Sequence, residues 1–146
     1  MHIIKQNDTT GCGLACIAAL LEIEYEVVKK IASNALCWSE RKKVFRTQPD
    51  QIVKLLAYYG VASSVTTFSE VEMSATASIL GVNSDSNGNF HWVIHIPHEN
   101  GNLIFDPETA ELYQCQRWLN IEGGYQIRQS SKKVVSTSIK IGEIKI

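Results

Sequence analysis

The sequence predicts an α+β fold, with helices in its first half and an antiparallel β-sheet in its second half. Residues 12–22 are apolar almost all round, and two further segments with helical spacing follow them. From residue 61 onward, short segments rich in β-branched and aromatic residues alternate with turn signals. Helices followed by strands favour α+β over an alternating α/β arrangement. The 146 residues suit a single domain over 1–146 that can bury a real core.

Three segments of the first half are predicted to be helices. Because residues 12–22 lack a polar face, this helix should be central and buried rather than amphipathic. Residues 24–34 place three aliphatic side chains at helical spacing, with charged residues opposite them. Residues 49–60 begin with a proline and an aspartate and end at Gly60, which are ordinary start and stop signals for a helix.

The second half is predicted to contain strands joined by polar loops. A turn or short helix is expected at 69–72 and a loop at 84–89. The alternating pattern of the tail breaks at Gly142–Glu143, which suggests a bulge or a hairpin there. The predicted strands cover residues 61–68, 75–82, 91–96, 102–106 and part of 138–146.

Composition excludes several functional classes. Apolar residues make up 45% of the chain and charged residues 20%, with a net charge of −1, so there is no broad electrostatic case for binding nucleic acid or anionic membranes. No apolar run reaches the roughly 20 residues that cross a bilayer, so we expect no direct membrane insertion. One basic run is interpreted as a solvated face or loop; it comprises Arg41, Lys42, Lys43 and Arg46.

The cysteines and the N-terminus indicate a reducing compartment. Four scattered cysteines are too few for a disulfide scaffold, and residues 1–8 lack the apolar stretch of a secretory signal. We therefore expect free thiols and a cytoplasmic location, although a domain excised from a larger exporter would have the same features. Cys37 and Cys115 are interpreted as isolated structural residues.

QNDTTGCGLAC, residues 6–16, suggests a nucleophile at the start of the central helix. A thiol attacks as thiolate, and the N–H groups and dipole of a helix N-terminus favour that negative charge. Gly11 and Gly13 would let a substrate backbone approach Cys12 closely. The amide of Gln6 and the backbone N–H of Cys12 could form an oxyanion hole.

HWVIHIPHENGNLIFDPE, residues 91–108, supplies the groups that would activate the thiol. His91 or His95 can act as base, and Asp106 can orient the imidazole. A tight hairpin at Asn100–Gly101 would place Asp106 opposite His95. For Asp106 to face His91, the loop would have to be wider, which Pro97 makes plausible because it lacks an N–H.

QNDTTGCGLAC, HWVIHI and IFDPE together resemble the bacteriocin-processing leader peptidases. These papain-like cysteine peptidases cleave after a double-glycine leader and often form the N-terminal domain of peptide-exporting ABC transporters. The resemblance covers about residues 4–110. It implies a papain-like fold and a hydrolase without cofactor or metal, with a peptide or protein substrate and a transporter partner. The implied roles are Gln6 in the oxyanion hole, Cys12 as nucleophile, His91 as base and Asp106 as orienting acid.

Other interpretations of the same residues remain open. Identical groups could support deamidation or transglutamination, or an effector or toxin that acts on another protein. The opposing class is a non-catalytic peptide-binding domain. A zinc site of Cys12, Cys16, His91 and His95 would leave Gln6 and Asp106 without roles, and Cys16 is interpreted as core packing rather than as a resolving thiol.

Overall fold

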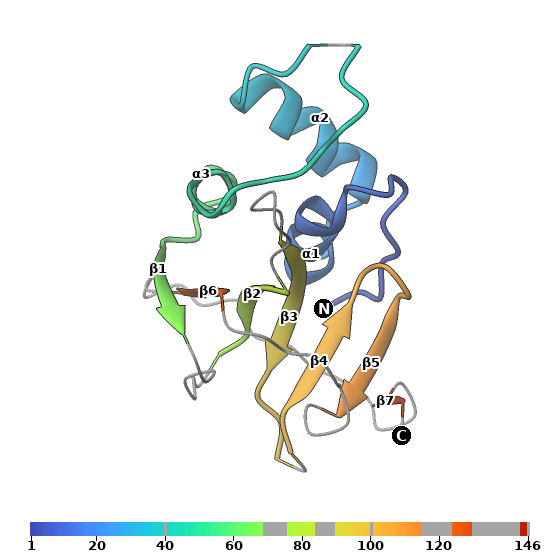
Figure 1. Cartoon of the computed structure of the whole chain (residues 1–146), viewed down its shortest axis with the longest axis vertical. Helices are drawn as coiled ribbons and strands as arrows, with labels where there is room; N and C mark the ends of the chain where they lie inside the picture. Colours follow the sequence, from blue (N-terminus) through green and yellow to red (C-terminus); the bar gives the residue numbers. More distant parts are fainter. Residues whose placement is uncertain are drawn as a thin grey trace.

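The computed structural model describes residues 1–39, 41–68, 76–83, 90–99, 101–114, 124–129 and 144–145. Within these residues it has the predicted α+β arrangement, with three helices packed on a sheet (Figure 1). The helices are α1 (Cys12–Leu21), α2 (Tyr25–Ala35) and α3 (Pro49–Tyr58), each within two residues of its predicted ends. None of the helices in this described part combines the length and apolar character that a bilayer crossing requires.

Helix α1 is the centre of the helical layer. Every residue from Cys12 to Leu20 is buried, because the helix packs against β3 on one side and against α2 on the other (Figure 1). The prediction of a central rather than amphipathic helix is confirmed. Helix α3 begins at Pro49, and a capping box between Gln48 and Gln51 stabilises its N-terminus. The helix covers the part of the sheet near β1 and β6.

The strands of the described residues form one sheet in the order β1-β6-β2-β3-β4-β5-β7. All neighbours are antiparallel except β5 and β7, which are parallel. Strands β5 and β6 were not predicted, while the expected turn at 69–72, the loop at 84–89, the break at Gly142–Glu143 and Cys115 lie outside the described residues. The strands are β1 (Ser63–Phe68), β2 (Ser78–Val82), β3 (His91–Ile96), β4 (Leu103–Asp106), β5 (Glu111–Gln114), β6 (Gly124–Gln129) and β7 (Ile144–Lys145).

The register between β3 and β4 differs from both predicted hairpins. Ile94 pairs with Phe105 and His95 with Ile104, so Asp106 faces neither histidine directly. Extended by one pair, this register places Asp106 opposite Val93, which is two positions after His91. Diagonal neighbours at this offset are about 7–8 Å apart, within reach of long side chains. Neither of the two predicted registers is formed, and a diagonal contact brings His91 to Asp106.

Trp92 joins the sheet to the segment between α2 and α3. Its side chain is 1% exposed and belongs to the core that the helices share with the sheet. Its indole Nε1 donates a hydrogen bond to the carbonyl of Thr47, with a donor–acceptor distance of 3.0 Å. This bond holds the extended chain around Thr47 against the end of β3 where His91 lies.

Candidate active site

Cys12 is the first residue of α1, so its thiol lies at the N-terminus of this helix. The N-cap Gly11 provides no side-chain cap, and no acidic residue lies in the first turn of the helix. The first N–H groups of a helix have no intrahelical partners, so they favour negative charge at this end. In addition, the backbone N–H of Trp92 donates to Sγ of Cys12 at 3.4 Å. Sequence reasoning missed this donor because any residue type can supply it.

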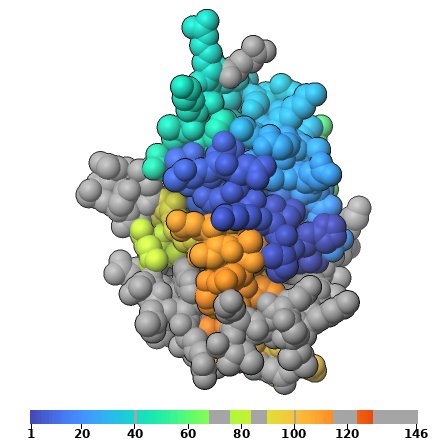
Figure 2. All heavy atoms as spheres, turned by 90° about the vertical axis from the view of Figure 1, so that its right-hand side faces the viewer, coloured from blue at the N-terminus to red at the C-terminus, as the bar shows by residue number. Residues whose placement is uncertain are grey.

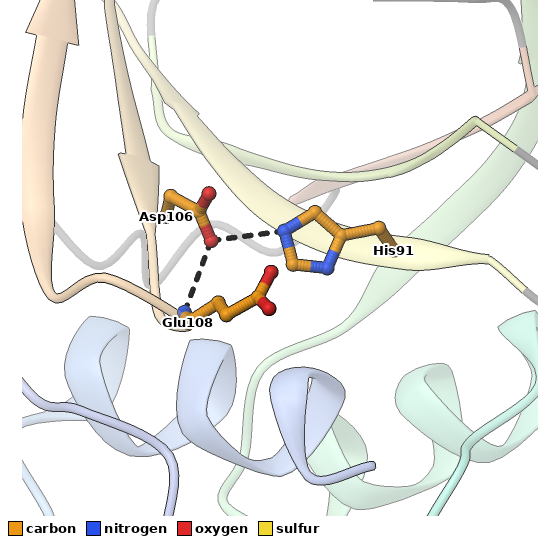
Figure 3. A group of neighbouring side chains, drawn as sticks. All are labelled: His91, Asp106 and Glu108. Carbon is orange, nitrogen blue, oxygen red and sulfur yellow. Dashed lines mark hydrogen bonds and ion pairs between the residues drawn. The ribbon is translucent and has the colours of Figure 1, made fainter. Parts of the chain in front are cut away.

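The side chains of His91 and Asp106 form an ion pair beside this thiol. His91 is the first residue of β3 and Asp106 the last of β4, and His91 Nε2 lies 2.9 Å from Asp106 Oδ1 (Figure 3). The backbone N–H of Glu108 donates to the same Oδ1 at 3.0 Å, which fixes the carboxylate from the following turn. With Nε2 bound to Asp106, Nδ1 is the ring nitrogen left to interact with Cys12, and the interaction with Cys12 contributes to the raised pKa of His91.

The surroundings of His91 favour its charged form. Burial alone would lower the pKa of His91, but the hydrogen bonds with Asp106 and Cys12 outweigh burial and raise the pKa to about 10. An imidazole with this pKa is protonated at neutral pH, so a cation stands next to the sulfur. Such a cation stabilises a thiolate by direct Coulomb attraction.

His95, the alternative base, lies away from this cluster. Its side chain is 2% exposed, and burial lowers its pKa. Its neighbours across the sheet are Ser78 and Ile104, and its Nδ1 has no hydrogen-bond partner in the described structure. Asp106 contacts His91 and not His95, so the geometry favours the first histidine of the pair.

The amide of Gln6 is engaged away from the sulfur. Its Nε2 donates to the carbonyls of Asp8 at 3.0 Å and Thr9 at 2.8 Å, while its Oε1 is buried without a partner. Its backbone N–H donates to the carbonyl of Pro107 at 3.0 Å, directly after Asp106. Gln6 therefore lies near the cluster. To serve in an oxyanion hole, its amide would have to leave these two carbonyls, so that role stays a prediction.

Gly11 and Gly13 allow close packing of the protein itself. A Cβ on Gly11 would lie 2.0 Å from the hydroxyl of Tyr25, and one on Gly13 would lie 2.1 Å from Oγ1 of Thr47. Both glycines are buried, so the expectation that they leave room for a substrate backbone was wrong. Their small size instead lets Tyr25 and Thr47 reach the start of α1.

The zinc interpretation finds no support in the geometry. In the described part of the chain, the one group of three or more metal-ligating side chains within 4.8 Å of each other is His91, Asp106 and Glu108 (Figure 3). Cys12, Cys16 and the two histidines of β3 therefore do not converge. The trio itself could offer ligands to a metal only if His91 gave up its bond to Asp106.

The remaining described cysteines have different environments. Cys16 is 0% exposed, and burial, followed by the charges of Cys12 and Asp106, raises its pKa well above the ordinary value. Its interpretation as core packing is confirmed. Cys37 is exposed, with a positive φ of 55°, so its thiol does not belong to the core; its interpretation as a structural residue stays a prediction.

A small cavity opens at the sulfur. Its volume is about 230 Å³, and Cys12 itself is 8% exposed. Polar side chains and one aromatic ring surround the thiol and the imidazole, and a peptide segment in the cavity could reach both. The lining residues are Thr9, Thr10, Cys12, Arg46, Asn83, Phe90 and His91.

Comparison with known proteins finds a similar fold among solved structures. The chain matches no protein-family model and no curated protein sequence. Among solved structures, it is similar to a double glycine motif protease from an AMS/PCAT transporter, determined in complex with the leader peptide. The TM-score is 0.60 at 15% sequence identity, over 88% of this chain and 89% of that one. At this identity the likeness concerns the fold, which is thus a distant relative of a peptidase fold.

Proposed function

We propose that this protein is a papain-like cysteine peptidase that cleaves a peptide bond by nucleophilic acyl transfer. The observation that carries the proposal is that Cys12 and His91 line one cavity, with His91 paired to Asp106. A thiol, an imidazole and an orienting carboxylate in this order form the minimal set for such chemistry. The likeness to a protease fold supports the same conclusion.

The proposed reaction uses these groups in sequence. The Cys12 thiolate attacks the peptide carbonyl, and the N–H groups at the start of α1 stabilise the oxyanion. The C–N bond then breaks as His91 gives its proton to the departing amine, leaving an acyl group on the sulfur. Water attacks this thioester with His91 taking its proton, and the C–S bond then breaks, which releases the acid and restores the thiolate and the imidazolium. Asp106 holds the ring and stabilises the imidazolium throughout.

A peptide with a double-glycine motif is the proposed substrate. The fold neighbour is described as a double glycine motif protease in complex with the leader peptide, which is what suggests this substrate. A peptide-exporting transporter is the corresponding proposed partner. Deamidation and transglutamination use the same groups, and their products differ in mass from those of hydrolysis.

Mass spectrometry of a peptide library tests the proposal. The library includes double-glycine peptides and is incubated with wild type and with Cys12→Ala. Hydrolysis gives two fragments whose summed mass exceeds that of the parent by one water, whereas deamidation raises the mass of an intact peptide by about 1 Da. We expect fragments from wild type alone. Equal cleavage by Cys12→Ala, or a mass change without cleavage, would refute the peptidase assignment.

A further inference from the structure

We infer that Arg46 makes the Cys12 cavity a receptor for a carboxylate, so that the protein selects substrates with an acidic side chain beside the reacting bond. The inference rests on the proposed function, because it concerns what the same cavity accepts. Its first basis is position: Arg46 lines the cavity together with Cys12 and His91. From the sequence, this arginine was interpreted as part of a solvated basic run.

The chain fixes Arg46 on both sides. Phe45 and Thr47 are 7% and 2% exposed, while Arg46 between them is exposed, as expected for alternating directions along an extended segment. The N–H of Phe45 donates to Oγ1 of Thr10 at 2.8 Å, and the carbonyl of Thr47 accepts from Trp92 at 3.0 Å. Thr10 also lines the cavity, so the backbone at Arg46 is attached directly to the cavity wall.

Among the described residues, no carboxylate pairs with Arg46. The described lining of the cavity also contains no carboxylate. Nearby Lys29 differs, since it pairs with Asp8 at 3.1 Å. Asp106 is already bound by His91. The cavity therefore presents a guanidinium and an imidazolium with no described acid to neutralise the guanidinium.

This arrangement fits one ligand chemistry. A guanidinium binds carboxylates through paired, charge-assisted hydrogen bonds, and it stays charged at every physiological pH. The hydroxyl-bearing Thr9 and Thr10 on the same wall can add neutral donors. Because the attraction acts on the bound peptide rather than on the reacting carbonyl, it should change KM more than kcat.

Competitive alkylation of Cys12 tests the inference without requiring any turnover. Anionic iodoacetate and neutral iodoacetamide attack the same sulfur, and peptide-level mass spectrometry separates Cys12 from the exposed Cys37. We expect the iodoacetate-to-iodoacetamide rate ratio at Cys12 to fall about threefold or more in Arg46→Gln, at low salt, and further in Arg46→Glu. Arg41→Gln removes the same charge outside the cavity and should leave the ratio at the wild-type value.

Protection of Cys12 by bound peptides is the second part of the test. Capped peptides that differ only in glutamate or glutamine beside the expected cleavage position are tested for protection of Cys12 from iodoacetamide. We expect stronger protection by the glutamate peptide in wild type and equal protection in Arg46→Gln. If cleavage fails but both parts of the test behave as expected, only the peptidase proposal falls. If the rate ratio is the same in wild type and Arg46→Gln, or the two peptides protect equally in wild type, the role of Arg46 is overturned.

Discussion

At the scale of single residues, the ion pair between His91 and Asp106 sets the electrostatics of the site. Its two side chains are 24% and 10% exposed, so solvent screens the pair only in part. The carboxylate also accepts the N–H of Glu108, which leaves it little freedom to turn away. A pair held in this way should affect both the free energy of unfolding and the reactivity of Cys12.

The stability of the fold should depend on pH through this pair. The pKa of folded His91, about 10, lies above the ordinary value of 6.5. A raised folded pKa stabilises the protein fully below 6.5, and the contribution is lost as pH rises toward 10. Asp106→Asn should therefore lower the free energy of unfolding by about 1.5–3 kcal/mol at pH 6 and by less at pH 10.

Urea unfolding at the two pH values measures this difference. Glu99→Gln, which removes an exposed carboxylate from the loop after β3, is the matched control and should cost little at either pH. An equal cost of Asp106→Asn at pH 6 and pH 10 would contradict the assignment of the raised pKa to this pair.

The structure and the family resemblance give Gln6 different roles. In the structure its amide binds two backbone carbonyls, whereas the resemblance implies that the amide belongs to the oxyanion hole. If its amide turns toward the oxyanion during the reaction, Gln6→Ala should lower kcat/KM about a hundredfold or more. The same variant should leave alkylation of Cys12 by iodoacetamide near the wild-type rate, because that displacement forms no oxyanion. Steady-state cleavage assays and alkylation rates provide the two readouts. An unchanged kcat/KM would restrict Gln6 to holding the loop at Asp8 and Thr9.

At the scale of elements, the position of α1 depends on the close approach of two side chains to its backbone at Gly13. Gly13 lies in its first turn, where Thr47 and Trp92 pack directly onto the helix backbone. Thr47 in turn leads into α3, and Trp92 belongs to β3. The start of α1, the segment before α3 and the first residues of β3 thus meet at one point, directly behind the sulfur.

Gly13→Ala should destabilise this junction. Alanine is the better helix former by about 1 kcal/mol, yet its Cβ would lie 2.1 Å from Oγ1 of Thr47 and 3.1 Å from Cδ1 of Trp92. We expect a net loss of about 1–3 kcal/mol in the free energy of unfolding, measured by urea denaturation.

Thr47→Ala provides the rescue. Its Oγ1 is buried without a partner, so its removal alone should cost little beyond the lost methyl contact. In Gly13→Ala/Thr47→Ala, the closest clash is gone, and part of the stability should return. Additive losses in the double variant would show that the contact with Thr47 is not the cause.

The elements that the sequence predicted well are those with local signals. Each helix is marked by its own apolar pattern or by Pro49 and Gly60, and β3 consists of β-branched and aromatic residues apart from its two histidines. Strand β5 is short and half polar, and it follows a turn that ends at Ala110 with a φ of 56°. Strand β6 pairs with β1 and β2, which are distant in sequence. Such pairing leaves no local signal.

At the scale of the whole molecule, the site depends on contacts between distant parts of the chain. The N-terminal segment lies against β4 and β5 on the surface (Figure 2), and the bond from Gln6 N to the carbonyl of Pro107 joins them at 3.0 Å. This contact brings the segment before Cys12 to the turn after Asp106. Residue types restricted the cluster to Cys12, Asp106 and one of two histidines, because the required chemistry uses few kinds of side chain, and the resemblance to leader peptidases singled out His91.

Other parts of the site could not be predicted in this way. The Trp92 N–H and the Glu108 N–H are backbone donors, which carry no sequence signal. Arg46 enters the cavity only because the segment around it is fixed by Thr10 and Trp92. The diagonal approach of His91 to Asp106 follows from a register that the loop composition did not determine.

The pairing of the Cys12 sulfur with the His91 imidazolium is tested most directly by the pH dependence of iodoacetamide alkylation at Cys12. Wild type should react at pH 5.5 at least about tenfold faster than His91→Gln, and the two rates should converge above pH 9, where an ordinary thiol ionises. His98→Gln, a substitution of the same kind beyond the end of β3, should follow the wild-type curve. Superimposable curves for wild type and His91→Gln would contradict the pairing.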